Sequence, residues 1–319
     1  MPTSSSATMS DYLENKIINH LFRNITFTSS SSLWLALYTS DPTDDNTGTE
    51  VTTSGGTNYS RIITFQKNSG TDVSGSAGPA FEISNMGGSY GIDLVAYEFP
   101  RDAIVAENIY YDFLQYNGVP SGKTWGTVTH WGLLDANTTG NLLFYGALSS
   151  GSGITTPLEN FRIEIGKLAI WFTGGAFCGD ISGSLLNHIL NGISYPSPTS
   201  LYAGLFLTPS SGGGTTATGI HLYTPILPIE VSASAGYNRV ELAGAGAWYA
   251  PTNGSTANSA SLVFSEDALS DWGIVGGIGI FTGSSGGSPI LYEFLENSKT
   301  VYQGDSFSMP IGALKVLIY

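Results

Sequence analysis

The sequence predicts a mainly β protein made of two tandem antiparallel β-sandwich or jelly-roll-like domains, each opened by one short α-helix. Three observations lead to this prediction. Short runs of β-forming residues alternate with Ser/Thr segments and turns, and glycine accounts for 41 of 319 residues. Each half begins with one stretch in which apolar residues recur at helical spacing. The same sequence blocks occur twice, in the same order.

The repeat is clearest in the opening helices. Ile18–Leu21 aligns with Leu186–Ile189, 168 positions later, and the alignment runs without a gap for over twenty residues. Later blocks also match, including Tyr59–Ile62 with Tyr237–Val240 and Trp125–Val128 with Trp272–Val275. We therefore predict a flexible N-terminal tail at residues 1–8, a first copy at 9–173 and a second copy at 174–319.

The first copy carries extra residues. Between the aligned pairs Phe81/Phe264 and Trp125/Trp272, the first copy has 44 positions and the second has 8, which implies an insertion of 36 residues at about 84–119. This segment is rich in tyrosine, and tyrosine offers a large contact area with a polar tip. The candidate partner contacts are Tyr90, Tyr97, Tyr110, Tyr111 and Tyr116. Alternatively, these side chains cover a small core of the insertion itself.

Each opening helix has start and stop signals. Asp11 with Glu14 three residues later fits a capping box. The apolar residues at helical spacing behind it are Leu13, Ile17 and Leu21. In the second copy, Asp180 is the expected cap and Gly192 the expected end of the helix.

The remaining blocks of the first copy predict strands. The expected strands are Leu33–Tyr38, Arg61–Phe65, Thr127–Leu134, Asn141–Leu148 and Phe161–Phe172. The turn Asp135–Gly140 predicts a hairpin between the third and fourth of them. The final run, Leu314–Tyr319, predicts a last strand.

Composition excludes several classes of partner. Eleven Lys and Arg against 25 Asp and Glu give a formal charge of −14, which opposes binding to nucleic acid or to an anionic membrane surface. The single Cys178 excludes an internal disulfide and a cysteine-based zinc site. We expect no secretory leader at Met1–Thr8 and no membrane-spanning helix.

Candidate catalytic residues are few, and we expect neither enzyme activity nor a cofactor. His20 and His188 occupy equivalent helix positions beside apolar residues, which favours packed side chains, and His130 aligns with a glycine. Gly283–Gly287 fits the nucleophile-elbow formula, but no helix is expected after it. Gly304–Ser306 resembles a hydrolase tripeptide and is discounted for the same lack of context.

Two groups of acidic residues could bind a metal ion or form ion pairs. Calcium favours sets of hard oxygen ligands, and the weak candidate set is Asp41, Asp44, Asp45 and Glu50. The spacing does not match an EF-hand, so a solvated turn is favoured. Glu50 also aligns with Glu230, and Arg61 aligns with Arg239, which predicts a structural ion pair in each copy.

Four blocks of the first copy resemble a known family. They are residues 10–17, 35–43, 125–136 and 140–148. They are similar to tailed-bacteriophage proteins usually labelled tail-fibre or virion structural proteins. The resemblance is fainter over the second copy, where Trp272–Gly273 and Tyr237–Arg239 remain.

The resemblance implies a non-enzymatic structural protein of a phage virion, assembled in the bacterial cytoplasm. We expect it in the tail, neck, baseplate or fibre attachment, as an oligomer that contacts other virion proteins. One alternative is a capsid decoration protein, of the cement or head-fibre kind. A second is a host glycan-binding module, whose sugar-stacking candidates are Trp34, Tyr90, Tyr111, Trp248 and Tyr249.

Overall fold

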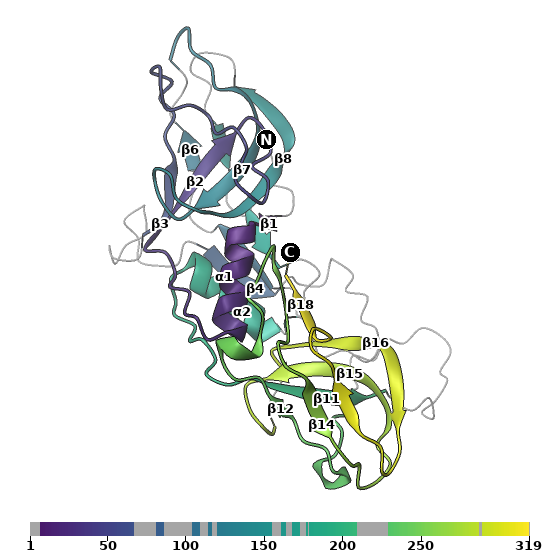
Figure 1. Cartoon of the computed structure of the whole chain (residues 1–319). Coiled ribbons are helices and arrows are strands. Elements are labelled where there is room, and N and C mark those ends of the chain that lie inside the picture. Colours follow the sequence, from purple (N-terminus) through teal and green to yellow (C-terminus); the bar gives the residue numbers. More distant parts are fainter. Residues whose placement is uncertain are drawn as a thin grey trace, which may run out of the picture.

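The molecule consists of two β-rich lobes at the ends of an elongated body, with two helices between them (Figure 1). The computed structural model describes residues 7–66, 81–85, 104–108, 114–116, 120–154, 161–163, 168–172, 177, 179–208, 229–286 and 289–318. All strand pairs among these residues are antiparallel. The predicted fold class, mainly β with antiparallel sheets and little helix, is confirmed.

The first lobe is built on a five-stranded sheet. In spatial order its strands are β1 (Thr8–Met9), β8 (Leu142–Ile154), β7 (Gly126–Leu134), β2 (Ser32–Tyr38) and β3 (Ile62–Gln66). The predicted hairpin joins β7 to β8. Gly140 in its turn has φ +81°, a left-handed conformation that glycine adopts without steric cost.

Shorter strands of the first half form two further sheets. One has the order β10 (Ala169–Trp171), β5 (Ile104–Asn108), β4 (Phe81–Asn85), and the other pairs β6 (Leu114–Tyr116) with β9 (Phe161–Ile163). The segment predicted as one strand, Phe161–Phe172, is therefore two strands, β9 and β10, that belong to different sheets.

The second lobe is built on a four-stranded sheet. Its spatial order is β12 (Val240–Glu241), β11 (Tyr202–Leu207), β15 (Gly273–Phe281), β16 (Leu291–Val301). Two pairs accompany it, β13 (Ser255–Ala257) with β18 (Lys315–Leu317) and β14 (Leu262–Ser265) with β17 (Phe307–Met309). Two 3-10 turns lie along this half of the chain, η2 (Ala233–Ala235) between β11 and β12 and η3 (Ala245–Ala247) between β12 and β13.

Both predicted helices form, with a correction at each start. The N-cap of α1 (Asp11–Phe22) is Ser10, whose Oγ accepts a hydrogen bond from the Leu13 N–H at 3.3 Å. The capping-box assignment to Asp11 is wrong by one residue, and Asp11 lies in the first turn, where the helix dipole favours negative charge. Likewise, α2 begins at Gly179, so Asp180 lies in its first turn.

The helices end in equivalent ways. Asn24, just beyond α1, has φ +52°, and Gly192, just beyond α2 (Gly179–Leu190), has φ +64°. A left-handed residue after the last turn satisfies exposed helix carbonyls and redirects the chain. The predicted end at Gly192 is confirmed.

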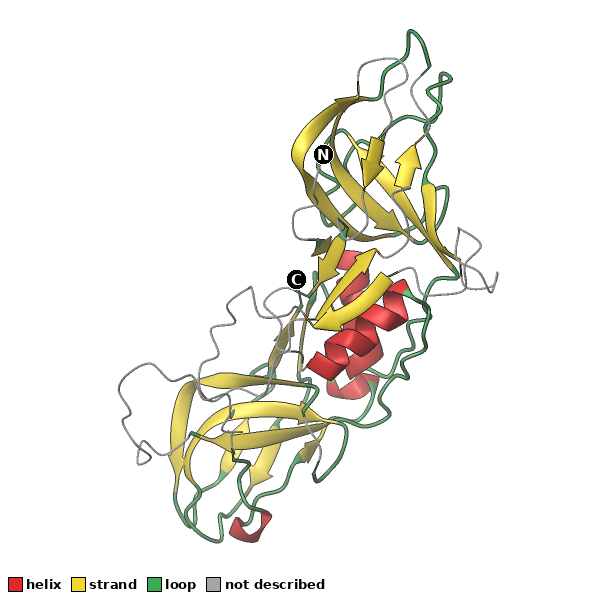
Figure 2. Ribbon diagram, turned by 180° about the vertical axis from the view of Figure 1, so that it is seen from behind, coloured by secondary structure: helices red, strands yellow, loops and turns green. Residues whose placement is uncertain are grey.

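The helices lie next to each other between the lobes (Figure 2), and each packs on strands of the other half. α1 contacts β8 of the first lobe and β13 of the second, whereas α2 contacts β4 and β5. The rings of Phe22 on α1 and Trp248 lie 5.2 Å apart, and the Gly254 N–H donates to Asn15 Oδ1 at 3.3 Å. The two halves are thus joined by exchanged helix contacts.

Strand pairings repeat between the halves. β5 pairs with β10 as β13 pairs with β18, and β6 pairs with β9 as β14 pairs with β17. Phe81 lies opposite Asn108, and Trp248 lies opposite Asn258 in the same way. Strands β5 and β6, inside the predicted insertion at 84–119, therefore have counterparts in the second half.

Between equivalent paired positions, the first half has more residues than the second. Phe81 and Asn108 are 27 positions apart but Trp248 and Asn258 only 10, so the β4–β5 hairpin is 17 residues longer. The span before β4 is also longer, because 20 positions separate Arg61 from Phe81 and 9 separate Arg239 from Trp248.

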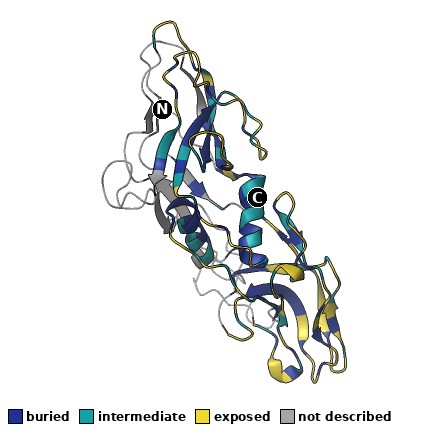
Figure 3. Ribbon diagram, turned by 60° about the vertical axis from the view of Figure 1, so that its left-hand side comes forward, coloured by how far each residue is buried: buried dark blue, intermediate teal, exposed yellow. Residues whose placement is uncertain are grey.

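One large cluster of buried apolar side chains runs through both lobes and the helices. It includes Trp131 and Trp248, which rank among the largest fully buried side chains of the described residues. The outer sheet faces carry smaller clusters, Ala36, Tyr38, Leu134 and Leu142 in the first lobe and Phe206, Phe281 and Tyr292 in the second. Figure 3 shows buried residues along the helices and the central strands, and exposed residues both in loops and on strands of the second lobe.

Candidate functional site

The matched glutamate and arginine of the first lobe form a bidentate ion pair. Arg61 Nε and Nη2 donate to the two carboxylate oxygens of Glu50 at 2.9 and 2.8 Å. Arg61 Nη1 also donates to the carbonyls of Ala136 and Thr139, at 2.7 and 2.6 Å. The Tyr59 hydroxyl donates to Glu50 Oε1 at 2.8 Å. Arg61 thereby links the β7–β8 turn to Glu50.

The second lobe repeats this arrangement with equivalent residues. Arg239 Nε and Nη2 each donate to Glu230 at 2.7 Å, and Nη1 donates to the carbonyls of Gly283 and Gly286 at 2.7 and 2.9 Å. The Tyr237 hydroxyl donates to Glu230 Oε1 at 2.9 Å. The Arg239 side chain is 3% exposed. The predicted structural ion pairs are confirmed, and both oxygens of each glutamate are engaged.

An aromatic pair extends each network. Tyr59 meets Trp125 edge to face, with ring centroids 5.6 Å apart, and the Trp125 Nε1–H donates to the Thr57 carbonyl at 2.8 Å. Tyr237 and Trp272 meet in the same way at 5.7 Å. Burial is the main reason why the pKa of Tyr237 lies above its ordinary value. Tyr237 therefore remains a protonated donor to Glu230.

The two hydrolase-like motifs lie in turns. Gly283–Gly286 connects β15 to β16, and its carbonyls accept from Arg239, so the strand-to-helix context of a nucleophile elbow is missing at this place. Asp305 stabilises the turn before β17, because its Oδ2 accepts from the Tyr302 N–H at 3.0 Å. Both motifs thus have structural roles here.

The acidic loop of the first lobe is fixed by hydrogen bonds. The Tyr145 hydroxyl donates to Asp44 Oδ1 at 2.6 Å, the Tyr38 hydroxyl donates to Asn46 Oδ1 at 3.0 Å, and Asp41 Oδ1 accepts from the Thr43 N–H at 2.9 Å. Burial raises the pKa of Tyr38 to about 12. The loop therefore covers the outer cluster of the first sheet.

These contacts give the calcium candidate no support. Glu50 is committed to Arg61, and within the described part of the chain no group of three His, Cys, Asp or Glu side chains is placed to hold a metal ion. Asp41, Asp44 and Asp45 are all among the residues described.

The two helix histidines stack on each other. Their ring centroids lie 5.2 Å apart at an interplanar angle of 13°, and the residues are 1% and 4% exposed. His20 Nδ1 accepts from the Phe27 N–H at 3.1 Å, while its Nε2 lies 3.0 Å from the Tyr195 carbonyl oxygen. His188 makes the reciprocal bonds, to the Tyr195 N–H at 3.2 Å and the Phe27 carbonyl at 2.8 Å. The prediction of packed histidines is confirmed.

The remaining described histidine, His130, lies on β7. Its Nδ1 is 2.9 Å from Thr129 Oγ1 and its Nε2 is 4.0 Å from Asp41 Oδ2. It has no counterpart in the second half, where Gly277 occupies the aligned position.

Glu14 is a buried carboxyl at the contact between the halves. The residue is 5% exposed and lies against Gly254, since a Cβ built on Gly254 would fall 2.3 Å from Glu14 Oε2. Burial, and then the neighbouring charges of Asp11 and Asp44, raise the pKa of Glu14 to about 7.

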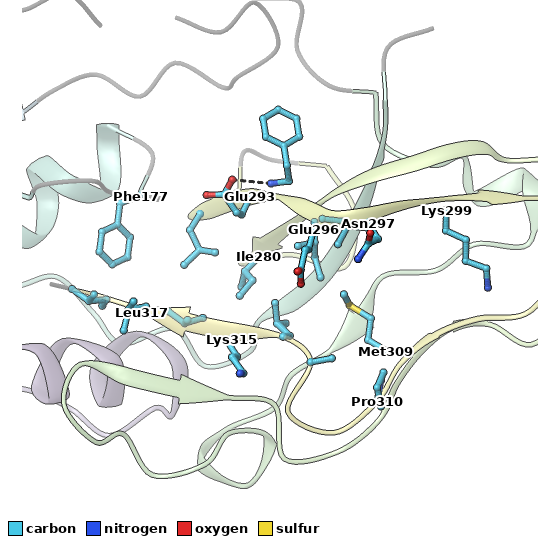
Figure 4. Close-up of a pocket in the computed structure, with 18 of the residues that line it drawn as sticks. Phe177, Ile280, Glu293, Glu296, Asn297, Lys299, Met309, Pro310, Lys315 and Leu317 are labelled. Atoms are coloured by element: carbon cyan, nitrogen blue, oxygen red, sulfur yellow. Dashed lines mark hydrogen bonds between the residues drawn. The ribbon is translucent and has the colours of Figure 1, made fainter. Parts of the chain in front are cut away.

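A cavity of about 730 Å³ lies beside β16, β17 and β18 (Figure 4). Its apolar walls include Phe177, Ile280 and Met309, and charged side chains surround them, among them Glu293, Glu296, Lys299 and Lys315. In Figure 4, Glu296 and Asn297 on β16 point across the cavity toward Met309.

The residues predicted to contact a partner or a sugar differ in their placement and exposure. Tyr90, Tyr97, Tyr110 and Tyr111 lie outside the described residues, and Tyr116 belongs to β6. Trp248 is 2% exposed and packs on Phe22, so the prediction that it stacks on sugars is wrong. Trp34 is partly buried and its Nε1–H donates to Ser32 Oγ at 3.1 Å. Tyr249 is 51% exposed.

Sequence reasoning missed a set of exposed apolar residues in the second half. They are Ile229, Leu269, Tyr302, Ile311 and Leu317, each at least 57% exposed. They lie in turns and on strand faces whose exposure depends on tertiary packing, so no local pattern marked them.

None of the described helices has the length and apolar character needed to cross a membrane. A search of the curated proteins found no match.

The family profile of the Podophage GP4 fiber I protein gp80 matches residues 8–96, 112–170 and 180–317. The match spans both lobes, so it extends the phage resemblance of the first-copy motifs to the second half. The chain therefore belongs to the family of Podophage GP4 fiber I protein gp80, a family of phage fibre proteins.

Proposed function

We propose that this chain is a non-enzymatic structural protein of a tailed-phage virion, part of a fibre or of its attachment at the tail, neck or baseplate. The family match over residues 8–96, 112–170 and 180–317 carries this proposal. The site geometry supports it, because the conspicuous polar groups bond to one another or to the backbone. Arg61 and Arg239 bind turn carbonyls, and the stacked histidines bind backbone groups.

Protein contacts are the proposed mode of action, with other virion proteins as partners and an oligomer as the working form. The exposed apolar residues of the second half are the proposed contacts, because burying apolar side chains against a partner is favourable. The cavity beside β16 adds a concave apolar surface in the same half. The tyrosines Tyr90, Tyr97, Tyr110, Tyr111 and Tyr116 remain proposed contacts for a specific partner. Assembly in the host cytoplasm before lysis is part of the proposal.

The decisive experiment counts this chain in purified virions. Quantitative mass spectrometry with labelled peptides would give its ratio to the major capsid protein. A small number of copies per particle is the expected result for a fibre or tail part. A ratio near that of the capsid protein would favour the alternative, a capsid decoration protein. Absence from virions would overturn both.

Contact variants would locate the interface. Leu269→Glu and Leu317→Glu should reduce incorporation into particles, because a charge at an apolar contact is costly to bury. Ile25→Glu is the matched control, since Ile25 is apolar and 45% exposed but lies in the first half. Equal incorporation of all three variants would contradict a contact surface on the second half.

Host glycan binding is a second candidate, favoured by the exposed ring of Tyr249. Aromatic rings commonly stack on sugars, and Tyr249 as a residue is 51% exposed. Glycan-array binding that is lost in Tyr249→Ala but kept in Tyr302→Ala would support it. No binding by the intact chain would remove it.

A further inference from the structure

The proton positions of the histidine pair are fixed by their partners. In each ring Nδ1 accepts a backbone N–H, so it carries no proton, and Nε2 faces a carbonyl oxygen, so it carries one. Each ring bonds to its own half through Nδ1 and to the other half through Nε2. Both imidazoles must therefore be neutral for all four hydrogen bonds to form.

Protonation would disrupt this arrangement at two points. A proton added to Nδ1 of His20 would face the Phe27 N–H, so two donors would oppose each other at 3.1 Å. If His188 were also protonated, two like charges would lie 5.2 Å apart in a buried contact. Both effects disfavour protonated imidazole rings, and both weaken the contact between the halves.

The surroundings provide no compensating negative charge. Burial lowers the pKa of His20, repulsion from His188 lowers it further, and the hydrogen bond to the Tyr195 carbonyl acts in the opposite direction. The other groups at the pair are the Tyr195 ring, 6.1 Å from His20, and the Phe27 ring, 5.7 Å from His188. Arg23, just after α1, is bonded to Asn19 Oδ1 at 2.7 Å. Among the described residues, no carboxylate contributes to the shift.

We propose that the stacked His20–His188 pair is an acid-sensitive latch, which holds the two halves together while both rings are neutral and releases them when the rings are protonated. The latch lies where the loop after each helix contacts the other half, since Ser197 Oγ also donates to the His20 carbonyl. Release would free α1 and α2 from their exchanged positions while the sheets of each lobe remain paired.

The sign of the pH effect follows from the direction of the shift. A histidine whose pKa is lower in the folded chain stabilises the fold above the ordinary pKa of about 6.5. That stability is lost as the pH falls below this value. Glu14, on the same helix, changes in the opposite sense, because it becomes neutral on acidification. Opening in acid therefore cannot come from Glu14.

The test follows the radius of gyration by small-angle X-ray scattering and the far-UV circular dichroism from about pH 7.5 to about pH 4.5. The intact chain should expand as the pH falls, with its far-UV signal retained. In the double variant His20→Gln, His188→Gln, the amides cannot be protonated, so the midpoint should move about one pH unit lower or more. His130→Gln, the control on β7, should leave the midpoint unchanged. Equal midpoints in all proteins, or a far-UV loss that coincides with the expansion, would overturn the latch.

A second measurement needs no variant and therefore stands if the double variant does not fold. Nitrogen-15 spectra of histidine-labelled protein report the tautomer and the titration of each ring. The latch requires the Nε2–H tautomer at neutral pH in two rings, with protonation of the pair coincident with the expansion. Ordinary titration of all the rings near pH 6.5 would overturn it.

Discussion

At the residue scale, the chain repeats one hydrogen-bond scheme around two arginines. Arg61 and Arg239 each join a glutamate, a tyrosine and two turn carbonyls. The planar guanidinium suits this task, because it can donate along two edges at once to a carboxylate and to backbone groups. This shared structural role explains why the same residue types recur in both halves.

Removing one arginine should destabilise its lobe. Arg239→Met would leave Glu230 partly buried without its cation and would free the carbonyls of Gly283 and Gly286, for an expected loss of about 3 kcal/mol in the free energy of unfolding. Arg239→Lys should recover only part of this, because an ammonium cannot bind the carboxylate in a bidentate manner. Urea unfolding followed by tryptophan fluorescence measures both, with Lys315→Met on exposed β18 as the control. Unchanged stability of Arg239→Met would contradict the structural role.

Glu14 should give the protein a specific pH dependence. Its pKa of about 7 in the folded chain exceeds its ordinary value, so protonated Glu14 stabilises the fold. This contribution falls as the pH rises from about 4.5 through 7. Glu14→Gln, which stays neutral, should therefore raise the melting temperature at about pH 8 and change it little at about pH 5. Glu241→Gln, at an exposed strand position, is the control. An equal change in the melting temperature at both pH values would contradict a raised pKa of Glu14.

At the element scale, the helices are defined by their caps and by one apolar face. Ser10 begins α1, and the buried face contains Leu13, Ile17 and Leu21. The residues after the two helices, Asn24 and Gly192, share a left-handed backbone. Because the two helices end in the same way, the loop after each helix reaches the histidine of the other helix.

The end of α2 offers a comparison at one position. Gly192→Ala should cost about 1 kcal/mol, because its Cβ is strained at φ +64°. Gly192→Asn should cost less, because asparagine tolerates this conformation and occupies it at position 24. Thermal unfolding of both variants checks this order. An asparagine variant as unstable as the alanine variant would show that glycine is needed there for another reason.

At the scale of the whole molecule, the halves are held by contacts that cross between them. Phe22 packs on Trp248, Asn15 accepts from Gly254, and the two histidines exchange backbone partners. Reciprocal contacts of this kind are typical of two-fold symmetric interfaces. The single chain thus contains an arrangement that resembles a dimer within one polypeptide.

Gly254 tests this contact between the halves. It has φ +64°, and a Cβ would lie 2.3 Å from both the Ile318 carbonyl oxygen and Glu14 Oε2. Gly254→Ala should therefore lower the free energy of unfolding by roughly 2 kcal/mol or more and loosen α1 from the second half. Gly246→Ala is the matched control, because no atom lies within 4 Å of its built Cβ. Thermal unfolding and small-angle scattering measure the two effects, and identical behaviour of both variants would refute the proposed close packing.

Much of this protein was determined by the sequence alone. The helix positions, the β7–β8 hairpin and the strands β2, β3, β7, β8 and β18 follow from local patterns, because spacing and turn chemistry act over a few residues. The paired glutamates and arginines were visible because both halves keep the same residue types at aligned places.

Only the tertiary structure decided how the halves meet. The helix contacts across the halves, the partners of His20 and His188 and the burial of Trp248 all depend on contacts between residues far apart in the chain. Short strands of two to five residues carry too little pattern to fix their partners, so their pairing is settled by the packing of the whole molecule.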